Sequence, residues 1–281
     1  MAYFMGIDVG TQGSRAVVID EDGVVIASES ASHVLHSPRS GWSEQNPNDW
    51  WEAVKASVYA VGKLVDLNAV SGIGLTGQMH GSVFLDSRHN VIRPALLWND
   101  QRTERQVRWM TQVAGDELLN IALNPAITGF QAPKIIWLRD EEPDNYQRIR
   151  SVLLPKDYIR LQLTGEQATD MSDASGTLLF DVANRRWSPS LMDLFEIPIE
   201  WMPEAFEGPD ETGRITKMVA SELGLPAGVP VAAGGGDNAA AAIGTGIVAA
   251  GVVSSSIGSS GAVFAYSDVP EPHPEGRLHT M

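Results

Sequence analysis

Short apolar runs separated by turn sequences predict β-structure at the start of the chain. The runs cover residues 3–9, 14–19 and 24–30. Between them lie a glycine-bracketed loop at 10–13 and an acidic turn at 20–23 that ends in glycine. We therefore expect the chain to open with a three-stranded antiparallel meander.

The next segment has the apolar spacing of an amphipathic helix. Asn46 and Pro47 are typical of a helix N-cap and a first helical residue. Apolar side chains then recur at spacings of three and four, which predicts one buried stripe: Trp51, Val54, Val58, Val61 and Val65. We expect further helices from residues 94–102 to about 114, from Pro133, over 158–163 and over 216–223. Strands are expected at 70–76, and as a hairpin at 82–86 and 91–92.

The last part of the chain repeats this hairpin architecture without a close sequence repeat. A short buried strand at 229–233 precedes three glycines and an alanine-rich helix at 238–243. Strands at 251–257 and 262–266 then flank a second glycine loop. We predict an N-terminal domain at 1–245 and the start of an incomplete second domain at 246–281, so that the chain is expected to be a fragment.

Composition narrows the class of protein. The 281 residues include 43% hydrophobic and 20% charged residues, which is ordinary for a globular protein. A net charge of −15 argues against nucleic acid or an anionic membrane as a partner. There is no cysteine, no basic leader segment and no apolar run of about 18 residues. We expect a cytoplasmic protein without disulfides or membrane spans.

Asp237 is the first chemical candidate. It follows the three glycines and lies on the N-terminal side of the expected helix. A carboxylate is favoured there, either as an ordinary helix cap or as a base held where another molecule can approach the backbone.

The glycine loop after the first strand is the second candidate. Its backbone N–H groups could cradle phosphate, with Asp8 beside it to hold hydrated magnesium; its residues are Gly10, Thr11, Gln12 and Gly13. An ordinary hairpin turn is the alternative. The second glycine loop, facing it, would complete a grip on a triphosphate; its residues are Gly258, Ser259, Ser260 and Gly261.

Two further segments have the composition of ligand-binding loops. Gln78, Met79 and His80 lie between glycines and offer directional hydrogen bonds. Trp98 and Asp100 lie in a polar segment that follows a buried strand, where an indole face and a carboxylate suit a sugar. The alternatives are a turn with an incidental histidine and a capped helix start.

Taken in order, these motifs resemble the N-terminal half of the FGGY carbohydrate kinase family, on its xylulose-phosphorylating branch. The resemblance covers the whole chain and includes residues 154–158 and 172–177. It implies an α/β actin-like ATPase (ribonuclease H-like) fold, with a mixed sheet flanked by helices and a truncated second domain. The family usually has threonine where Ser259 stands, and the serine keeps the hydroxyl.

The resemblance also implies roles. Asp237 would be the general base, Asp8 and Thr11 would lie near magnesium, and the two glycine loops would bind ATP. The sugar would meet Gln78, Met79, His80, Trp98, Asp100 and Asn238.

The expected activity is phosphorylation of D-xylulose by MgATP, with this piece not expected to act alone. Alternatives are an inactive sugar-binding fragment or pseudokinase, or a kinase for another sugar such as ribulose or gluconate. The sequence leaves open a homodimer that would cover apolar surface.

Overall fold

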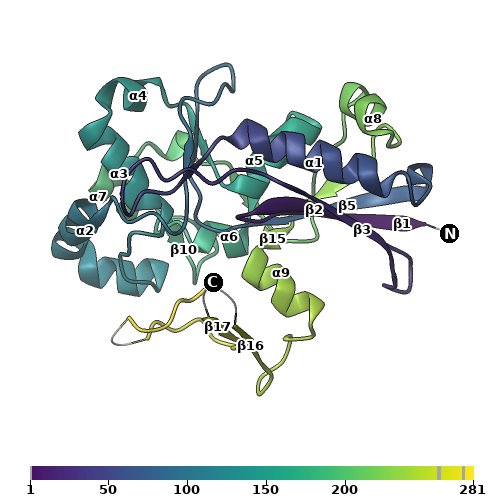
Figure 1. The fold of residues 1–281 in the computed structure, drawn as a ribbon. Coiled ribbons are helices and arrows are strands. Elements are labelled where there is room, and N and C mark those ends of the chain that lie inside the picture. The colour runs from purple at the N-terminus through teal and green to yellow at the C-terminus, as the bar shows by residue number, and fades with distance from the viewer. Residues whose placement is uncertain (1, 258–260, 274–275) are drawn as a thin grey trace.

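A mixed sheet forms the centre of the molecule (Figure 1). The computed structural model describes residues 2–257, 261–273 and 276–281. Strands β1 (Tyr3–Val9), β2 (Gly13–Ile19) and β3 (Val25–Ser32) are antiparallel neighbours, which confirms the predicted meander. On its other side β1 pairs in parallel with β5 (Val70–Gly77).

Three strands from the C-terminal half complete this sheet. β14 (Pro230–Ala232) and β15 (Gly235–Gly236) both pair in parallel with β5, and β13 (Glu211–Arg214) is antiparallel to β14. The order is β13-β14-β5-β1-β2-β3, with β15 pairing β5 farther along. The sheet therefore unites segments that are about 160 residues apart in sequence.

Helices α1 (Pro47–Val61), α5 (Pro155–Thr164) and α8 (Lys217–Leu223) contribute to the core on this sheet. Asn46 caps α1 as predicted, because its side chain accepts the Asn48 N–H at 3.2 Å. The buried stripe is shorter than predicted: α1 ends at Val61, so Val65 lies beyond it. Trp50 is fully buried, whereas Trp51 is only half-buried.

A second core lies beside the sheet, among helices and short strand pairs (Figure 1). Its principal helices are α2 (Glu104–Glu117), α3 (Gln131–Glu141), α4 (Pro143–Arg148) and α7 (Pro189–Phe195). A π-helical turn, Leu118–Ala122, follows α2, and short 3-10 turns span Leu67–Ala69 and Ile199–Trp201.

The small strands pair over long sequence distances. The pairs are β4 (Glu44–Gln45) with β7 (Ala95–Leu96), β6 (Val83–Leu85) with β8 (Ser151–Leu153), β9 (Ala168–Asp170) with β12 (Glu204–Phe206), and β10 (Phe180–Asp181) with β11 (Arg186–Trp187). The hairpin predicted at 82–92 is present but short: Leu85 bridges Val91, and the Ile92 N–H donates to the Phe84 carbonyl at 2.9 Å. The other edge of β6 pairs with β8. The helix after Trp98 begins only at Glu104.

The glycine run is required by packing within the chain. Gly234 has a φ of +77°, and a Cβ there would lie 1.9 Å from the Leu75 carbonyl oxygen of β5. A Cβ on Gly236 would lie 2.8 Å from Met79. The glycines therefore allow β5 and the Met79 side chain to approach the backbone closely.

Helix α9 (Asp237–Gly244) follows this run, and Figure 1 shows it on the opposite side of the sheet from α1. Beyond α9, β16 (Val253–Ile257) and β17 (Gly261–Ala265) form the predicted hairpin. Ile243 and Val263 expose 70% and 75% of their surface there. In the described part of the chain, no helix is long and apolar enough to cross a membrane. The domain boundary at 245 stays a prediction.

The Gly234 geometry gives a stability test. Gly234→Ala should lower the free energy of unfolding by more than about 3 kcal/mol, since it adds a backbone clash to an unfavourable φ. Gly224→Ala is the matched control: φ is +71°, but nothing lies within 4 Å of the added Cβ, so the loss should be about 1–2 kcal/mol. Urea unfolding measures both, and equal losses would contradict the packing argument.

Candidate active site

Two carboxylates lie at the same edge of the sheet, on either side of the end of β5. In the register of the sheet, Asp8 of β1 pairs with Thr76 of β5, and Thr76 pairs with Gly235 of β15. Because Ile7 and Val9 point into the core, alternation directs Asp8 to the other face, where α9 begins with Asp237. Residues from both ends of the chain thus meet at one edge.

Electrostatics also links the two carboxylates. Burial and the negative charge of Asp237 raise the pKa of Asp8 to about 6, although the positive charge of Arg15 opposes this shift. Burial raises the pKa of Asp237 as well, against the effect of the Asn238 N–H. A cation beside Asp8 would relieve this unfavourable burial of negative charge.

Asp237 does not occupy the helix-cap position, which belongs to Gly236. Its Oδ1 accepts the backbone N–H of Asn238 at 2.7 Å and the Asn238 amide at 3.1 Å. Asp237 is half-buried and Asn238 is exposed. The carboxylate is thus held locally at the helix start while it stays in reach of a ligand.

The first glycine loop is a tight turn. The Gly10 N–H donates to the Gly13 carbonyl at 3.0 Å, and the Gln12 carbonyl accepts from the His33 N–H. A Cβ on Gly13 would lie 2.7 Å from the Ala31 carbonyl of β3, which explains why glycine stands there. The loop connects β1 and β2 directly after Asp8.

The Thr11 hydroxyl in this loop joins it to both predicted sugar-binding segments. It accepts the indole N–H of Trp98 at 3.0 Å and donates to Gln78 Oε1 at 3.2 Å. Gln78 is 1% exposed. Three segments that the sequence predicted separately are therefore brought together by one hydroxyl.

Gln45 is the residue of this network that sequence reasoning missed. Its Nε2 donates to the Thr11 carbonyl at 2.7 Å and lies 3.0 Å from His33 Nδ1. Its Oε1 accepts from Trp50 at 2.9 Å and from Gln78 at 3.0 Å. Nothing in the spacing before α1 marks Gln45, because every partner except Trp50 comes from another segment.

Met79 and His80 differ in how deeply their side chains are buried. Met79 is 3% exposed and packs on Gly236. His80 is half-buried, with a φ of +66° and its Nδ1 2.9 Å from the Gly176 carbonyl oxygen. Burial, and secondarily Lys134, lower the pKa of His80 to about 3, so the imidazole is neutral at physiological pH.

Lys134, also missed by sequence reasoning, supports the histidine loop. Its buried ammonium donates to the carbonyls of His80 and Gly129, both at 2.7 Å. Burial lowers its pKa to about 7, with Asp100 opposing that shift and Arg102 adding to it. The strained backbone at His80 is thus tied to α3.

Trp98 and Asp100 have different surroundings. Trp98 exposes 38% of its surface, but Asp100 is fully buried. Asp100 binds the Arg102 guanidinium and accepts the Ser43 N–H at 2.7 Å. Arg102 lies 3.6 Å from the centre of the Trp42 ring. In this structure Asp100 orders the loop through Arg102, and direct contact of Asp100 with sugar stays a prediction.

The second glycine loop, predicted to bind phosphate, falls mostly outside the described residues. Gly258, Ser259 and Ser260 lie outside the described residues, and Gly261 starts β17 opposite Ile257. Its role stays a prediction.

A magnesium ion fits what is described of the site. Thr76 Oγ1 is buried beside Asp8 and lacks a hydrogen-bond partner among the described residues. That part of the chain contains no cluster of three metal-binding side chains. Magnesium often uses only one or two carboxylates, with water and substrate phosphates as its other ligands. Asp8 could therefore hold it.

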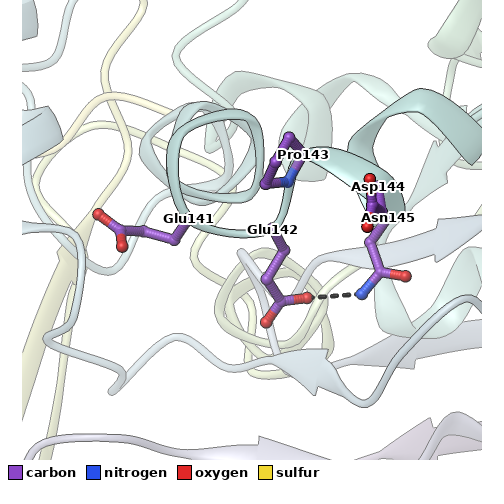
Figure 2. A pocket seen from close by; sticks show the side chains of 5 residues that line it. All are labelled: Glu141, Glu142, Pro143, Asp144 and Asn145. Carbon is purple, nitrogen blue, oxygen red and sulfur yellow. Dashed lines mark hydrogen bonds between the residues drawn. The ribbon is translucent and has the colours of Figure 1, made fainter.

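A surface hollow elsewhere is unsuitable for this chemistry. It lies where α3 meets α4 and is lined by Glu141, Glu142, Pro143, Asp144 and Asn145 (Figure 2). Glu142 accepts a bond from Asn145 at 2.7 Å within it. Three carboxylates would repel phosphate, and no predicted site residue lines it.

Comparison with known proteins identifies the family to which the chain belongs. Residues 3–244 match the N-terminal domain of the FGGY family of carbohydrate kinases. The chain belongs to this family. The match contains both carboxylates and the first glycine loop, so these features lie within the family domain.

The relatives extend this result. Xylulose kinase of Escherichia coli (strain K12) is 41% identical over 278 residues, which are 99% of this chain but 57% of the relative. The crystal structure of a xyloylose kinase from Brucella ovis superposes with a TM-score of 0.94 at 40% identity, over 99% of this chain and 57% of that one. The chain therefore spans little more than half the length of these relatives.

The fold is shared more widely than the substrate. A gluconate kinase from Lactobacillus acidophilus also has a TM-score of 0.94, at 22% identity and over 99% of this chain and 56% of that one. The FGGY kinase members have the actin-like ATPase fold, which confirms the predicted fold class. At this identity the likeness reports the fold alone.

The raised pKa of Asp8 predicts a pH-dependent stability. Because the folded state holds this proton more tightly than the unfolded state, stability should fall as pH rises from about 4 to about 6. Asp8→Asn should therefore stabilise the protein by about 3 kcal/mol at pH 7.5 and by little at pH 4. Urea unfolding at both pH values measures this, with Asp22→Asn in the exposed turn as control. A destabilised Asp8→Asn protein at pH 7.5 would contradict the assigned burial cost.

The Gln45 network gives a second prediction. Gln45→Met keeps the side-chain length but leaves the Trp50 and Gln78 donors without their shared acceptor. Stability should fall by about 2–4 kcal/mol, since unsatisfied buried donors are costly. Gln147→Met, at an exposed position, should change little. Similar thermal unfolding of the two variants would show that the network contributes nothing.

Proposed function

We propose that this chain is the sugar-binding part of a kinase that transfers the γ-phosphoryl group of MgATP to the terminal hydroxyl of D-xylulose. The supporting observation is Asp237, a carboxylate with a raised pKa at the sheet edge beside Asp8. The 41% identity to a xylulose kinase supports the choice of sugar.

Asp237 acts as the general base. A base is most effective when its pKa is near the working pH, and burial moves the Asp237 pKa in that direction. The local bonds from Asn238 hold one carboxylate oxygen, which orients the group toward the sugar hydroxyl. Asn238 also extends toward the sugar from the first turn of α9.

The sugar binds against the loop that follows β5. His80 is neutral, so it can exchange hydrogen bonds with sugar hydroxyls without adding charge. The exposed Trp98 offers an indole face, and Met79 forms an apolar floor against Gly236. Gln78 holds this wall through Thr11 and Gln45.

The phosphates lie over the residue 10–13 loop, with Gly258–Gly261 as the opposing loop. Bound magnesium would neutralise phosphate charge, and Asp8 is the residue that would hold its hydrated form. The two carboxylates then have different roles: Asp8 would hold the metal, and Asp237 would accept the proton of the sugar hydroxyl. Exclusion of water would limit wasteful hydrolysis of ATP.

Other substrates and an inert fragment are the competing functions. The shared fold of the gluconate kinase leaves the sugar to be decided by the loop that contains Gln78, Met79 and His80. A panel of xylulose, ribulose and gluconate separates these substrates. Calorimetry of the 281-residue chain with xylulose and with ATP tests the inert fragment, which would bind sugar alone. We propose that the reaction takes place in the cytoplasm. The homodimer stays a prediction, which the sedimentation coefficient of the protein tests.

The base assignment is tested in a chimera in which residues 1–281 replace the matching segment of Escherichia coli xylulose kinase. Asp237→Asn should lower kcat by roughly 100- to 10,000-fold while xylulose binding by calorimetry persists, because the amide cannot accept the proton. Asp193→Asn, at an exposed position, is the control. Near-normal turnover of Asp237→Asn would rule out this base.

A further inference from the structure

A buried ionic cluster lies behind the glycine run and has no part in the proposed chemistry. Lys156 is fully buried, and its ammonium lies 2.6 Å from Asp157, 2.8 Å from Asp170 and 3.3 Å from Asp173. Arg160 lies 3.9 Å from Asp157. Burying five ionisable groups in one place is expensive unless their geometry is well satisfied.

The charges of the cluster depend on one another. Burial alone would lower the pKa of Lys156, but the three carboxylates outweigh it and hold this pKa above its usual value. Burial raises the pKa of Asp173 well above its ordinary value, against the attraction of Lys156. The cluster therefore favours a charged lysine.

Arg160 connects the cluster to the start of the glycine run. Its guanidinium donates to the backbone carbonyls of Ala232 and Ala233, and to the Thr212 hydroxyl of β13. These two carbonyls immediately precede Gly234. The segment thus enters the sharp turn at Gly234 from a fixed position.

Ser172 connects the cluster to the end of the run. Its hydroxyl donates to Asp170 Oδ2 and accepts the backbone N–H of Gly236 at 3.2 Å. Asp170 in turn caps α6 (Met171–Ser175), because it accepts the Ser172 N–H at 2.8 Å. Asp170 therefore fixes the direction of the Ser172 hydroxyl proton. A lone pair of the Ser172 oxygen stays free to accept the Gly236 N–H.

The glycines themselves have no side chains by which to be held. Their position must come from backbone pairing with β5 and from groups that bind their backbone. The cluster supplies such groups on both sides of the run, and Asp237 directly follows Gly236. Ser172 is only half-buried, so its hydroxyl can be removed without opening the core.

We propose that Ser172 is a positioning residue for Asp237, oriented by Asp170 and Lys156, and acting through the backbone of Gly236. This inference rests on the proposed function. Sequence reasoning placed residues 154–158 and 172–177 in the family pattern without giving either a role. In the structure Ser172 contacts Gly236 directly, and Lys156 is linked to Ser172 through Asp170.

The kinetic test uses the chimera described above. Ser172→Ala should lower kcat roughly 10- to 100-fold with little change in KM for xylulose, since a small displacement of the base affects the chemical step. Ser172→Thr, which keeps a hydroxyl, should restore most of kcat. Ser71→Ala, on an exposed serine, is the matched control. Loss in KM alone, or no loss in kcat, would overturn the proposal.

A double mutant separates positioning from a general structural effect. If Ser172 acts through Asp237, adding Ser172→Ala to Asp237→Asn should lower kcat by less than about twofold, because residues that act as a unit are not additive. A full multiplicative loss in the double mutant would overturn the proposal.

Amide hydrogen exchange makes the test independent of the kinase assignment. In the 281-residue chain, Ser172→Ala should speed exchange of the Gly236 amide at least tenfold, while the Val18 amide in the central sheet keeps its protection. Unchanged exchange at Gly236 would overturn the positioning role. Normal turnover of Asp237→Asn with faster exchange at Gly236 would instead remove the base assignment and, with it, the catalytic meaning of this contact.

Discussion

The close approach of the glycine run to β5 is the constraint on which the rest of the site depends. The backbone at Gly234 passes so near the Leu75 carbonyl that no side chain fits there. Gly235 and Gly236 then pair with the last residues of β5, which on its other edge pairs with β1. One strand thereby sets the distance between Asp8 and Asp237, although 229 positions separate them in the chain.

This constraint has an electrostatic consequence. The two carboxylates lie on either side of the end of β5 and are partly buried there, and each has a raised pKa. A protein that needed only stability would avoid such a pair, because burial of uncompensated charge is unfavourable. In the proposed kinase reaction the pair would be useful, since one carboxylate would hold a metal and the other would accept a proton. The cost to folding and the proposed chemistry therefore have the same origin.

A network of polar side chains holds the loops of the candidate site in place. Gln45, Gln78 and Thr11 join the glycine loop to the sugar-side wall, and Lys134 fixes the backbone of His80. Behind them, Arg160 and Ser172 hold the backbone on both sides of the glycine run. Such supporting shells matter because catalytic geometry tolerates only small displacements.

The sequence by itself determined the local elements: the opening meander, the Asn46 cap of α1, the stop of α8 at Gly224 and the hairpin after α9. Each is decided by turn chemistry, caps or apolar spacing within a few residues. It also predicted Asp8 and Asp237 as candidate site residues, because a carboxylate beside glycines at a strand end is a local pattern.

Only the tertiary structure decided the rest. Besides the nearby residues 91–92, β6 pairs with the distant β8, and Asp100 is turned inward to Arg102. Gln45, Lys134 and Ser172 gained their importance from partners 33 to 64 residues away. A side chain's burial and its hydrogen-bond partner are set by which distant segments pack against it, and local sequence does not contain that information.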